Sequence, residues 1–126
     1  MRYGVRLAAP IAWMAMIWML SSLPATQDNT IGGIFMPEVV QKAAHVVVYG
    51  VLGLAWFWAF DLRYGARAAS LWACCFTSAY AAIDEFHQTF VPGRYGSWWD
   101  VALDTIAALL ALTIILIPRR RQHAPK

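Results

Sequence analysis

Charged residues are scarce in this chain of 126 residues: they fill 13% of its positions, whereas hydrophobic residues fill 60%. A soluble domain usually has about 25% charged and about 45–50% apolar residues. So few charged side chains cannot cover a water-facing surface, which excludes an ordinary soluble domain. The length suits a single domain, and the sequence has no internal repeat, low-complexity linker or coiled-coil heptad pattern.

Cysteine is also rare, since the chain has only Cys74 and Cys75. Adjacent residues of a helix point about 100° apart, which is poor geometry for a disulfide between them. We therefore interpret both as small buried hydrophobic residues that give no information on the redox compartment. Metal-binding signatures such as HExxH are missing too, so we predict neither a bound metal nor another cofactor.

The net charge of +3 does not indicate nucleic-acid binding, because the basic residues stand at the ends of apolar runs rather than in a stripe. In that position they indicate membrane topology and contacts with anionic lipid. We therefore predict membrane lipid as a partner of this chain, and no nucleic acid.

Four apolar runs are each long enough for a transmembrane helix, which needs about 20 mostly apolar residues. They cover residues 5–24, 39–60, 66–90 and 98–117, and short turns at 61–65 and 91–97 separate the later runs. The sequence therefore predicts an all-α fold: an integral membrane four-helix bundle that forms one domain over residues 1–126. The polar residues 118–126 are expected to form a basic tail.

The first run has a rival interpretation as a cleaved signal peptide, since Arg2 and Arg6 accompany its start. The run is long for the apolar region of such a peptide. The residues near its end, Leu23-Pro24-Ala25, also lack the small-residue pattern of a cleavage site. We therefore favour a retained membrane helix.

The basic residues fall unequally on the two sides that four spans would define. Two of the ten, Lys42 and Arg94, fall on one side, and the others fall on the side of both termini. The others are Arg2, Arg6, Arg63, Arg67, Arg119, Arg120, Arg121 and Lys126. Because positive charge is retained in the cytoplasm, we predict that the N- and C-termini are cytoplasmic and that residues 25–37 and 91–97 face outward.

Several polar residues lie inside the apolar runs, where a charged side chain is costly and usually faces a partner or a water-filled cavity. His45 and Tyr49 are four residues apart, so they share a helix face. Asp84, His87 and Gln88 share a face of the third run in the same way. These groups are therefore candidates for a function.

The fourth run begins with two further carboxylates, Asp100 and Asp104, which are four residues apart. Ser97 and Asp100 resemble a capping box. Asp104 lies about 6 Å deeper by the helix rise and needs a donor, for which Arg94 and His45 are candidates. The same helix has a small-residue face that predicts close packing, made of Ala107, Ala108 and Ala111.

These polar groups fall at one depth, which defines a candidate site on the predicted outer side. Its members are His45, Tyr49, Asp84, Glu85, Gln88, Arg94 and Asp100, with Lys42, His87 and Asp104 as secondary members. We expect Glu85 to be rotated towards the headgroup layer, and Arg94 and Lys42 to be recruited by the carboxylates. Two interpretations stay open: a network that locks the helices together, or a polar cavity that opens outward.

The motifs in this order resemble those of a known family. Lys42-Ala43-Ala44-His45 followed by Tyr49 is similar to its K-x-x-H-x-x-x-Y segment. The stretch Asp84-Glu85-Phe86-His87-Gln88, then Val91-Pro92-Gly93-Arg94, then Ser97 and Asp100, is similar to its D-E-x-x-Q…PGR…S-x-x-D stretch. Ser21-Ser22 also fits. The chain thus resembles the VanZ-like family of small bacterial membrane proteins. It departs from the family pattern at Asp104, where the family usually has Asn, and at Ala107 or Ala108, where the family usually has Gly.

The resemblance implies a multi-pass protein of the bacterial inner membrane with a role in glycopeptide (teicoplanin) resistance or in the cell envelope. Three functions stay open on this basis. The first is an outward-facing pocket that binds a lipid headgroup, a cell-wall precursor or a glycopeptide. The second is a membrane-embedded acid/base enzyme that acts on such a headgroup through His45, Asp84 and Glu85. The third is a purely structural membrane partner.

Overall fold

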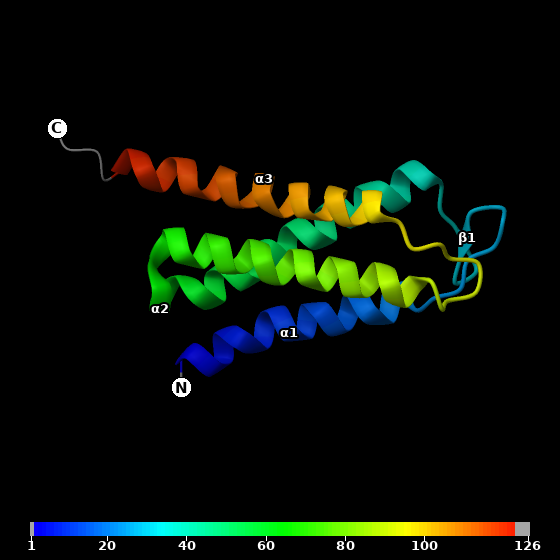
Figure 1. Cartoon of the computed structure of the whole chain (residues 1–126), viewed down its shortest axis with the longest axis horizontal. Coiled ribbons are helices and arrows are strands. Elements are labelled where there is room, and N and C mark those ends of the chain that lie inside the picture. Colours follow the sequence, from blue (N-terminus) through cyan, green and yellow to red (C-terminus); the bar gives the residue numbers. More distant parts are fainter. Residues whose placement is uncertain (1, 123–126) are drawn as a thin grey trace.

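The computed structural model describes residues 2–122 and consists of long helices with one small hairpin (Figure 1). In those residues, α1 spans Arg2–Ser21, α2 spans Glu38–Gln88 and α3 spans Trp98–Gln122. The hairpin pairs β1, Thr30–Ile31, with β2, Ile34–Phe35. The predicted helical fold class is therefore confirmed, with three continuous helical elements in place of four separate ones.

α2 contains the reversal that we predicted as a turn over residues 61–65. Gly65, with φ 72° and ψ 165°, interrupts the helix, whereas residues 61–64 remain helical. Glycine adopts a positive φ without the steric cost that a Cβ brings, so the chain can reverse at a single residue. Residues 38–64 and 66–88 then run side by side as the two arms of α2 (Figure 1).

α2 is the central element, because α1 and α3 each pack against it and make no close backbone contact with one another within residues 2–122. The indole of Trp13 donates a hydrogen bond to the carbonyl of Val48 at 2.9 Å. The hydroxyl of Tyr80 donates to the carbonyl of Met14 at 2.6 Å. These two bonds attach α1 to both arms of α2.

The first arm of α2 approaches α3 closely through small residues, where the sequence predicts close packing. A Cβ added at Gly53 would lie 3.0 Å from the Cβ of Ala108, which is itself fully buried. Small residues let helix backbones come together in lipid, where van der Waals contact drives association. The remaining core is apolar and includes Leu52, Trp56, Phe57 and Phe60 from one arm and Ala69, Ala73, Tyr80 and Ala81 from the other.

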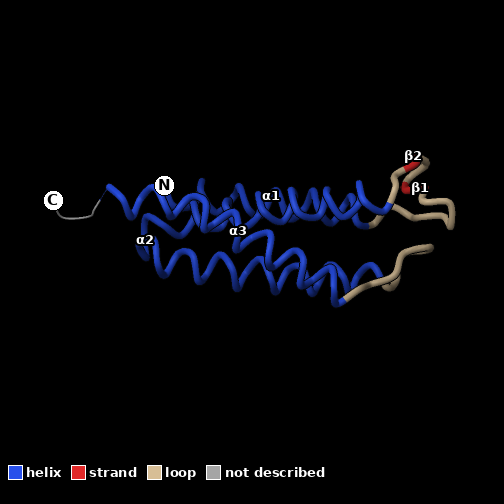
Figure 2. The backbone as a smooth tube through the Cα atoms, turned by 90° about the horizontal axis from the view of Figure 1, so that it is seen from above, coloured by secondary structure: helices blue, strands red, loops and turns tan. Residues whose placement is uncertain are grey.

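The segment between α1 and α2 forms a hairpin around Gly32 and Gly33, which have φ values of 56° and 84°. A two-residue hairpin turn of this kind requires positive φ at both central positions, and glycine meets that requirement. Ile31 of β1 is buried, whereas Ile34 and Phe35 of β2 are exposed. The hairpin and residues 89–97 lie at the same end of the helices (Figure 2), which we name the hairpin end.

Several helix boundaries differ from the predicted ones. The first arm of α2 starts at residue 38 and continues to residue 64 rather than 60, and the second arm ends at Gln88 rather than at residue 90. α1 ends at Ser21 rather than at residue 24, because a residue that precedes proline, here Leu23, is disfavoured in helical conformation. α3 continues to Gln122, so residues 118–122, which we assigned to the tail, are helical in their backbone. The rest of that tail, residues 123–126, lies outside the described residues.

The outer faces of the helices are apolar and exposed. Met19, Leu71 and Ile114 are 72%, 65% and 70% exposed, for example. All three helices are long and apolar enough to cross a membrane. The start of α1 and the end of α3 lie at the same end, opposite the hairpin end (Figure 1). These features fit a membrane protein whose lipid-facing surface is made of these side chains.

The contact at Gly53 gives a test of the packing between α2 and α3. Gly53→Ala should lower the thermal stability of the purified protein, because overpacking typically costs about 1–3 kcal/mol. The added Cβ would meet the Cβ and Cα of Ala108, which has no flexible side chain to move aside, so this cost should outweigh the about 1 kcal/mol that alanine gains over glycine inside a helix. Unfolding is measured by circular dichroism in detergent.

Gly50→Ala is the matched control, because its added Cβ would lie 3.8 Å from its nearest neighbours, an ordinary contact distance. It should leave stability unchanged or raise it. Equal behaviour of the two variants would contradict the close approach at Gly53.

Candidate polar site at the hairpin end

The first group of polar side chains forms a chain of hydrogen bonds from the first arm of α2 to the loop before α3. The hydroxyl of Tyr49 donates to Asp84 Oδ2 at 3.0 Å, and Gln88 Nε2 donates to the same oxygen at 3.1 Å. Arg94 Nη1 then donates to Gln88 Oε1 at 3.4 Å. Tyr49, Asp84 and Gln88 are all buried, so this chain joins the two arms of α2 inside the protein.

Arg94 also holds the end of α1. Its Nε donates to the carbonyl of Leu23 at 3.1 Å, and its Nη2 donates to the carbonyl of Leu20 at 3.4 Å. The last carbonyls of a helix have no partners within the helix and carry partial negative charge, so a guanidinium suits them. Burial lowers the pKa of Arg94, and the carboxylates of Asp84 and Glu85 oppose that effect.

The second group lies between the first arm of α2 and the start of α3. His45 Nδ1 is 3.2 Å from Asp104 Oδ2, and the backbone N–H of Ser97 donates to Glu85 Oε2 at 2.8 Å. One ligand atom from each of His45, Glu85 and Asp104 lies within 4.8 Å of the others. Of the two donors suggested for Asp104, the structure therefore selects His45.

The expectation for Glu85 is wrong. Its side chain does not extend towards the headgroup layer but is 5% exposed, and Ser97 binds it. Glycine at position 96 permits this bond, because a Cβ there would lie 2.3 Å from the carbonyl of Glu85. Glu85 faces α3 while its neighbour Asp84 faces Tyr49, so consecutive positions of one helix are both buried.

Three other candidates lie apart from these two groups. Lys42 pairs with Glu38 at 2.9 Å on the surface, so the expectation that the buried carboxylates recruit it is wrong. His87 packs on Trp18 of α1, with ring centroids 3.9 Å apart, instead of facing the site with Asp84. Asp100 is partly exposed at the start of α3.

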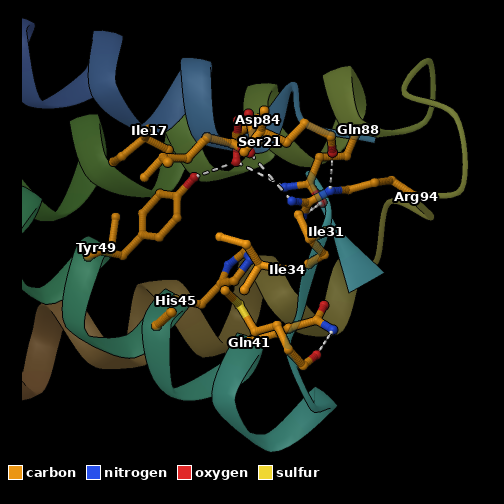
Figure 3. A pocket seen from close by; sticks show the side chains of 15 residues that line it. Ile17, Ser21, Ile31, Ile34, Gln41, His45, Tyr49, Asp84, Gln88 and Arg94 are labelled. Atoms are coloured by element: carbon orange, nitrogen blue, oxygen red, sulfur yellow. Dashed lines mark hydrogen bonds between the residues drawn. The ribbon is translucent and has the colours of Figure 1, made fainter. Parts of the chain in front are cut away.

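Two cavities meet at these polar side chains. The apolar cavity has a volume of about 230 Å³ and its lining includes Ile17, Leu20, Leu23, Ile31, Ile34, Met36 and Val48. The polar cavity has a volume of about 480 Å³ and its lining includes Thr26, Asn29, Glu38, Lys42, Tyr95 and Asp100. Gln41, His45, Gln88 and Arg94 line both. Figure 3 shows Tyr49 and His45 on one side of the apolar cavity and Arg94 across from them.

The two loops that line the polar cavity are organised by hydrogen bonds within and between them. The Thr26 hydroxyl donates to the carboxylate of Asp28, which lowers the pKa of that exposed carboxyl group below its ordinary value. The backbone N–H of Ala25 donates to the carbonyl of Pro92 at 3.0 Å. Gly93 is required beside this bond, because a Cβ there would lie 1.7 Å from the carbonyl oxygen of Ala25.

Sequence reasoning missed the apolar wall that the hairpin supplies through Ile31 and Ile34. A signal for it exists, since Gly32-Gly33 between two isoleucines is a typical two-residue hairpin sequence. It also missed Gln41, which lines both cavities and donates to the carbonyl of Met36 at 2.7 Å.

The arrangement suits binding of a molecule with an apolar and a polar part. Most ligand sites are largely apolar with a few fixed polar groups, and the junction of the two cavities has that character. His45 oriented by Asp104 is also a pairing that acid–base chemistry uses. None of the hydrogen bonds described for residues 2–122 places a serine, threonine or cysteine against that histidine.

The bond between Tyr49 and Asp84 gives a test of the first group. Tyr49→Phe should lower stability by about 1–3 kcal/mol, because it removes a donor from a buried carboxylate. The other oxygen, Asp84 Oδ1, already has no partner. The measurement is thermal unfolding of the purified protein in detergent.

Asp84→Asn completes a double-mutant cycle with Tyr49→Phe, in which residues in contact show a coupling energy. The double variant should lose less stability than the sum of the two single losses. Additive losses would mean that the two side chains do not interact.

The family model of VanZ/LLP1 matches residues 7–119, which covers nearly all of the chain and both groups of polar residues. No match was found among curated proteins or among solved structures. The resemblance that the sequence motifs carry is therefore confirmed, and the chain belongs to the VanZ/LLP1 family.

Proposed function

We propose that this chain is a multi-pass protein of the bacterial inner membrane whose outward-facing site binds the headgroup end of an envelope lipid, and that this binding lowers susceptibility to teicoplanin. The observation that carries the proposal is the junction of the apolar and polar cavities at Gln41, His45, Gln88 and Arg94. Hydrocarbon is favoured in the apolar cavity and a charged headgroup in the polar one, so an amphipathic molecule fits both.

The charges around the polar cavity support a phosphate-containing headgroup. Arg94 and Lys42 supply positive charge, and a guanidinium is well suited to phosphate oxygens. Glu38 and Asp100 supply acceptors for an amine or for sugar hydroxyls on the same headgroup. Phospholipids and lipid-linked cell-wall precursors share this chemistry.

The purely structural alternative is less well supported. A network that only locks helices together should satisfy its buried polar atoms, since each unsatisfied group is costly. Asp84 Oδ1, Glu85 Oε1 and Asp104 Oδ1 are buried without a partner. Of these three residues, Asp84 lines the apolar cavity, so its unpaired acceptor fits a site that receives a ligand.

The acid/base enzyme remains a second candidate on one observation, the pairing of His45 with the fully buried Asp104. A carboxylate that orients an imidazole is a common feature of general bases. Chemical conversion of a bound lipid distinguishes this function from binding alone.

The outward orientation rests on a proposed topology of four spans. We assign them to α1, the two arms of α2 and α3, with cytoplasmic termini, as the distribution of positive charge favours. The exposed aromatic residues at the hairpin end, Tyr95, Trp98 and Trp99, suit the outer membrane–water interface. The single domain and the inner-membrane location belong to the same proposal.

The topology is tested with cysteine variants in which Cys74 and Cys75 are replaced by alanine. Gln27→Cys, in the exposed loop at the hairpin end, should react with a membrane-impermeant maleimide in intact cells. Tyr64→Cys, next to the reversal of α2, should react only after lysis. Labelling of Tyr64→Cys in intact cells, or of Gln27→Cys only after lysis, would show that the orientation is reversed.

The lipid site is tested by filling the apolar cavity. Ala44 lines that cavity, so Ala44→Phe should reduce the amount of phospholipid that stays bound to the purified protein. Native mass spectrometry measures the retained lipid, and any chemically altered lipid would reveal an enzyme. In a glycopeptide-susceptible bacterium that the wild type protects, Ala44→Phe should also lower protection against teicoplanin.

Ala43→Phe is the matched control, because Ala43 is the adjacent exposed position and lines neither cavity. It should retain lipid and protection at the level of the wild type. Equal lipid retention by both variants would contradict binding in the apolar cavity. Equal protection with unequal retention would separate resistance from lipid binding.

A further inference from the structure

The second polar group has a composition that the proposed lipid site does not explain. His45, Glu85 and Asp104 come from three different segments, the two arms of α2 and α3, yet one ligand atom from each lies within 4.8 Å of the others. Asp104 is 0% exposed and Glu85 is 5% exposed. Two buried carboxylates therefore face one imidazole at the point where three segments meet.

Neither carboxylate is satisfied by the protein alone. Asp104 Oδ2 is near His45 Nδ1, and Glu85 Oε2 accepts the N–H of Ser97, but Asp104 Oδ1 and Glu85 Oε1 are buried without a partner. Buried charged groups in proteins are normally paired or coordinate a metal. An unpartnered oxygen on each of these two neighbouring carboxylates indicates that the group has a further partner.

The nearby basic side chains do not fill that role. Lys42 forms an ion pair with Glu38 on the surface. Arg94 donates hydrogen bonds to Gln88 and to the carbonyls of Leu20 and Leu23. A proton neutralises one carboxylate, whereas a divalent cation offsets both negative charges and contacts all three groups at once. Side chains 4.8 Å apart or less need only small rotations to reach a common ion.

The geometry points to a binding site for one divalent transition-metal ion of the zinc or manganese class, formed by His45, Glu85 and Asp104. Imidazole nitrogen and carboxylate oxygen together suit these ions, which accept mixed nitrogen and oxygen ligands. Magnesium and calcium prefer oxygen ligands alone. The site extends beyond the lipid-binding function and does not depend on it.

An ion has a route to this site. His45 is 21% exposed in its side chain and lines both cavities, whereas its two carboxylate neighbours are buried behind it. The polar cavity is also lined by Asp100, whose carboxylate an entering cation can contact before it reaches His45. The ion then binds between the imidazole and the buried carboxylates.

The site is tested with metal-free protein whose affinity tag has been removed. Calorimetric titration with Zn²⁺ and with Mn²⁺ should show one saturable site per chain for at least one of the two ions. Glu85→Gln and Asp104→Asn should each weaken binding at least tenfold, because each removes a charged ligand while keeping the side-chain shape. Asp28→Asn is the matched control at an exposed carboxylate of the loop between α1 and β1 that lines neither cavity, and it should bind like the wild type.

Absence of saturable binding by the wild type would overturn the metal site, and so would unchanged affinity in both Glu85→Gln and Asp104→Asn. If these two variants fail to accumulate, His45→Ala at the partly exposed ligand replaces them, with the same expected loss. A Co²⁺ titration of the wild type is an independent measurement, since visible absorption bands of a four-coordinate complex should appear and Zn²⁺ should abolish them. Lipid retention by the same preparations is measured in parallel, so failure of the metal site and failure of the lipid site are distinguishable.

Discussion

Three carboxylates are buried at one end of an apolar group of helices, and the surrounding structure is arranged around them. Removing a charged group from water is costly unless hydrogen bonds or opposite charges replace the lost solvation. Asp84 accepts hydrogen bonds from Tyr49 and Gln88. Asp104 is paired with His45, and Glu85 accepts a hydrogen bond from the backbone N–H of Ser97. These donors come from different segments, so the cost of burial is offset only when the segments are assembled.

The loops at the hairpin end follow from the same constraint. The backbone N–H of Ser97 can bond to the Glu85 carboxylate because Gly96 has no side chain that would clash with the Glu85 carbonyl. Gly93 lets the loop before α3 contact Ala25, which brings Arg94 to the end of α1. The hairpin then closes the apolar side of the cavity with Ile31 and Ile34. As a result, the apolar cavity and the polar cavity meet at the side chains of Gln41, His45, Gln88 and Arg94.

Much of this arrangement could be predicted from local sequence spacing. A separation of four residues places His45 and Tyr49 on one helix face, and the short loop after Gln88 keeps Arg94 near the third run. The predictions that failed depend on which neighbouring segment covers each face of a helix. The spacing correctly separates Glu85 from Asp84, but only the position of α3 shows that this second face is buried too. The pairing of Lys42 is a further example, since Glu38, one turn away, binds that lysine in place of the buried carboxylates.

Arg94 shows how one residue joins the parts of this site. Its three nitrogens bond to the carbonyls of Leu20 and Leu23 and to the side chain of Gln88. A lysine has the same charge but only one nitrogen, so it cannot bind all three acceptors with the same geometry. The guanidinium thus fixes the end of α1 against the second arm of α2, and through Gln88 it orients the donor to Asp84. The same contacts hold positive charge at the junction of the two cavities, so Arg94 both joins the helices and belongs to the proposed ligand site.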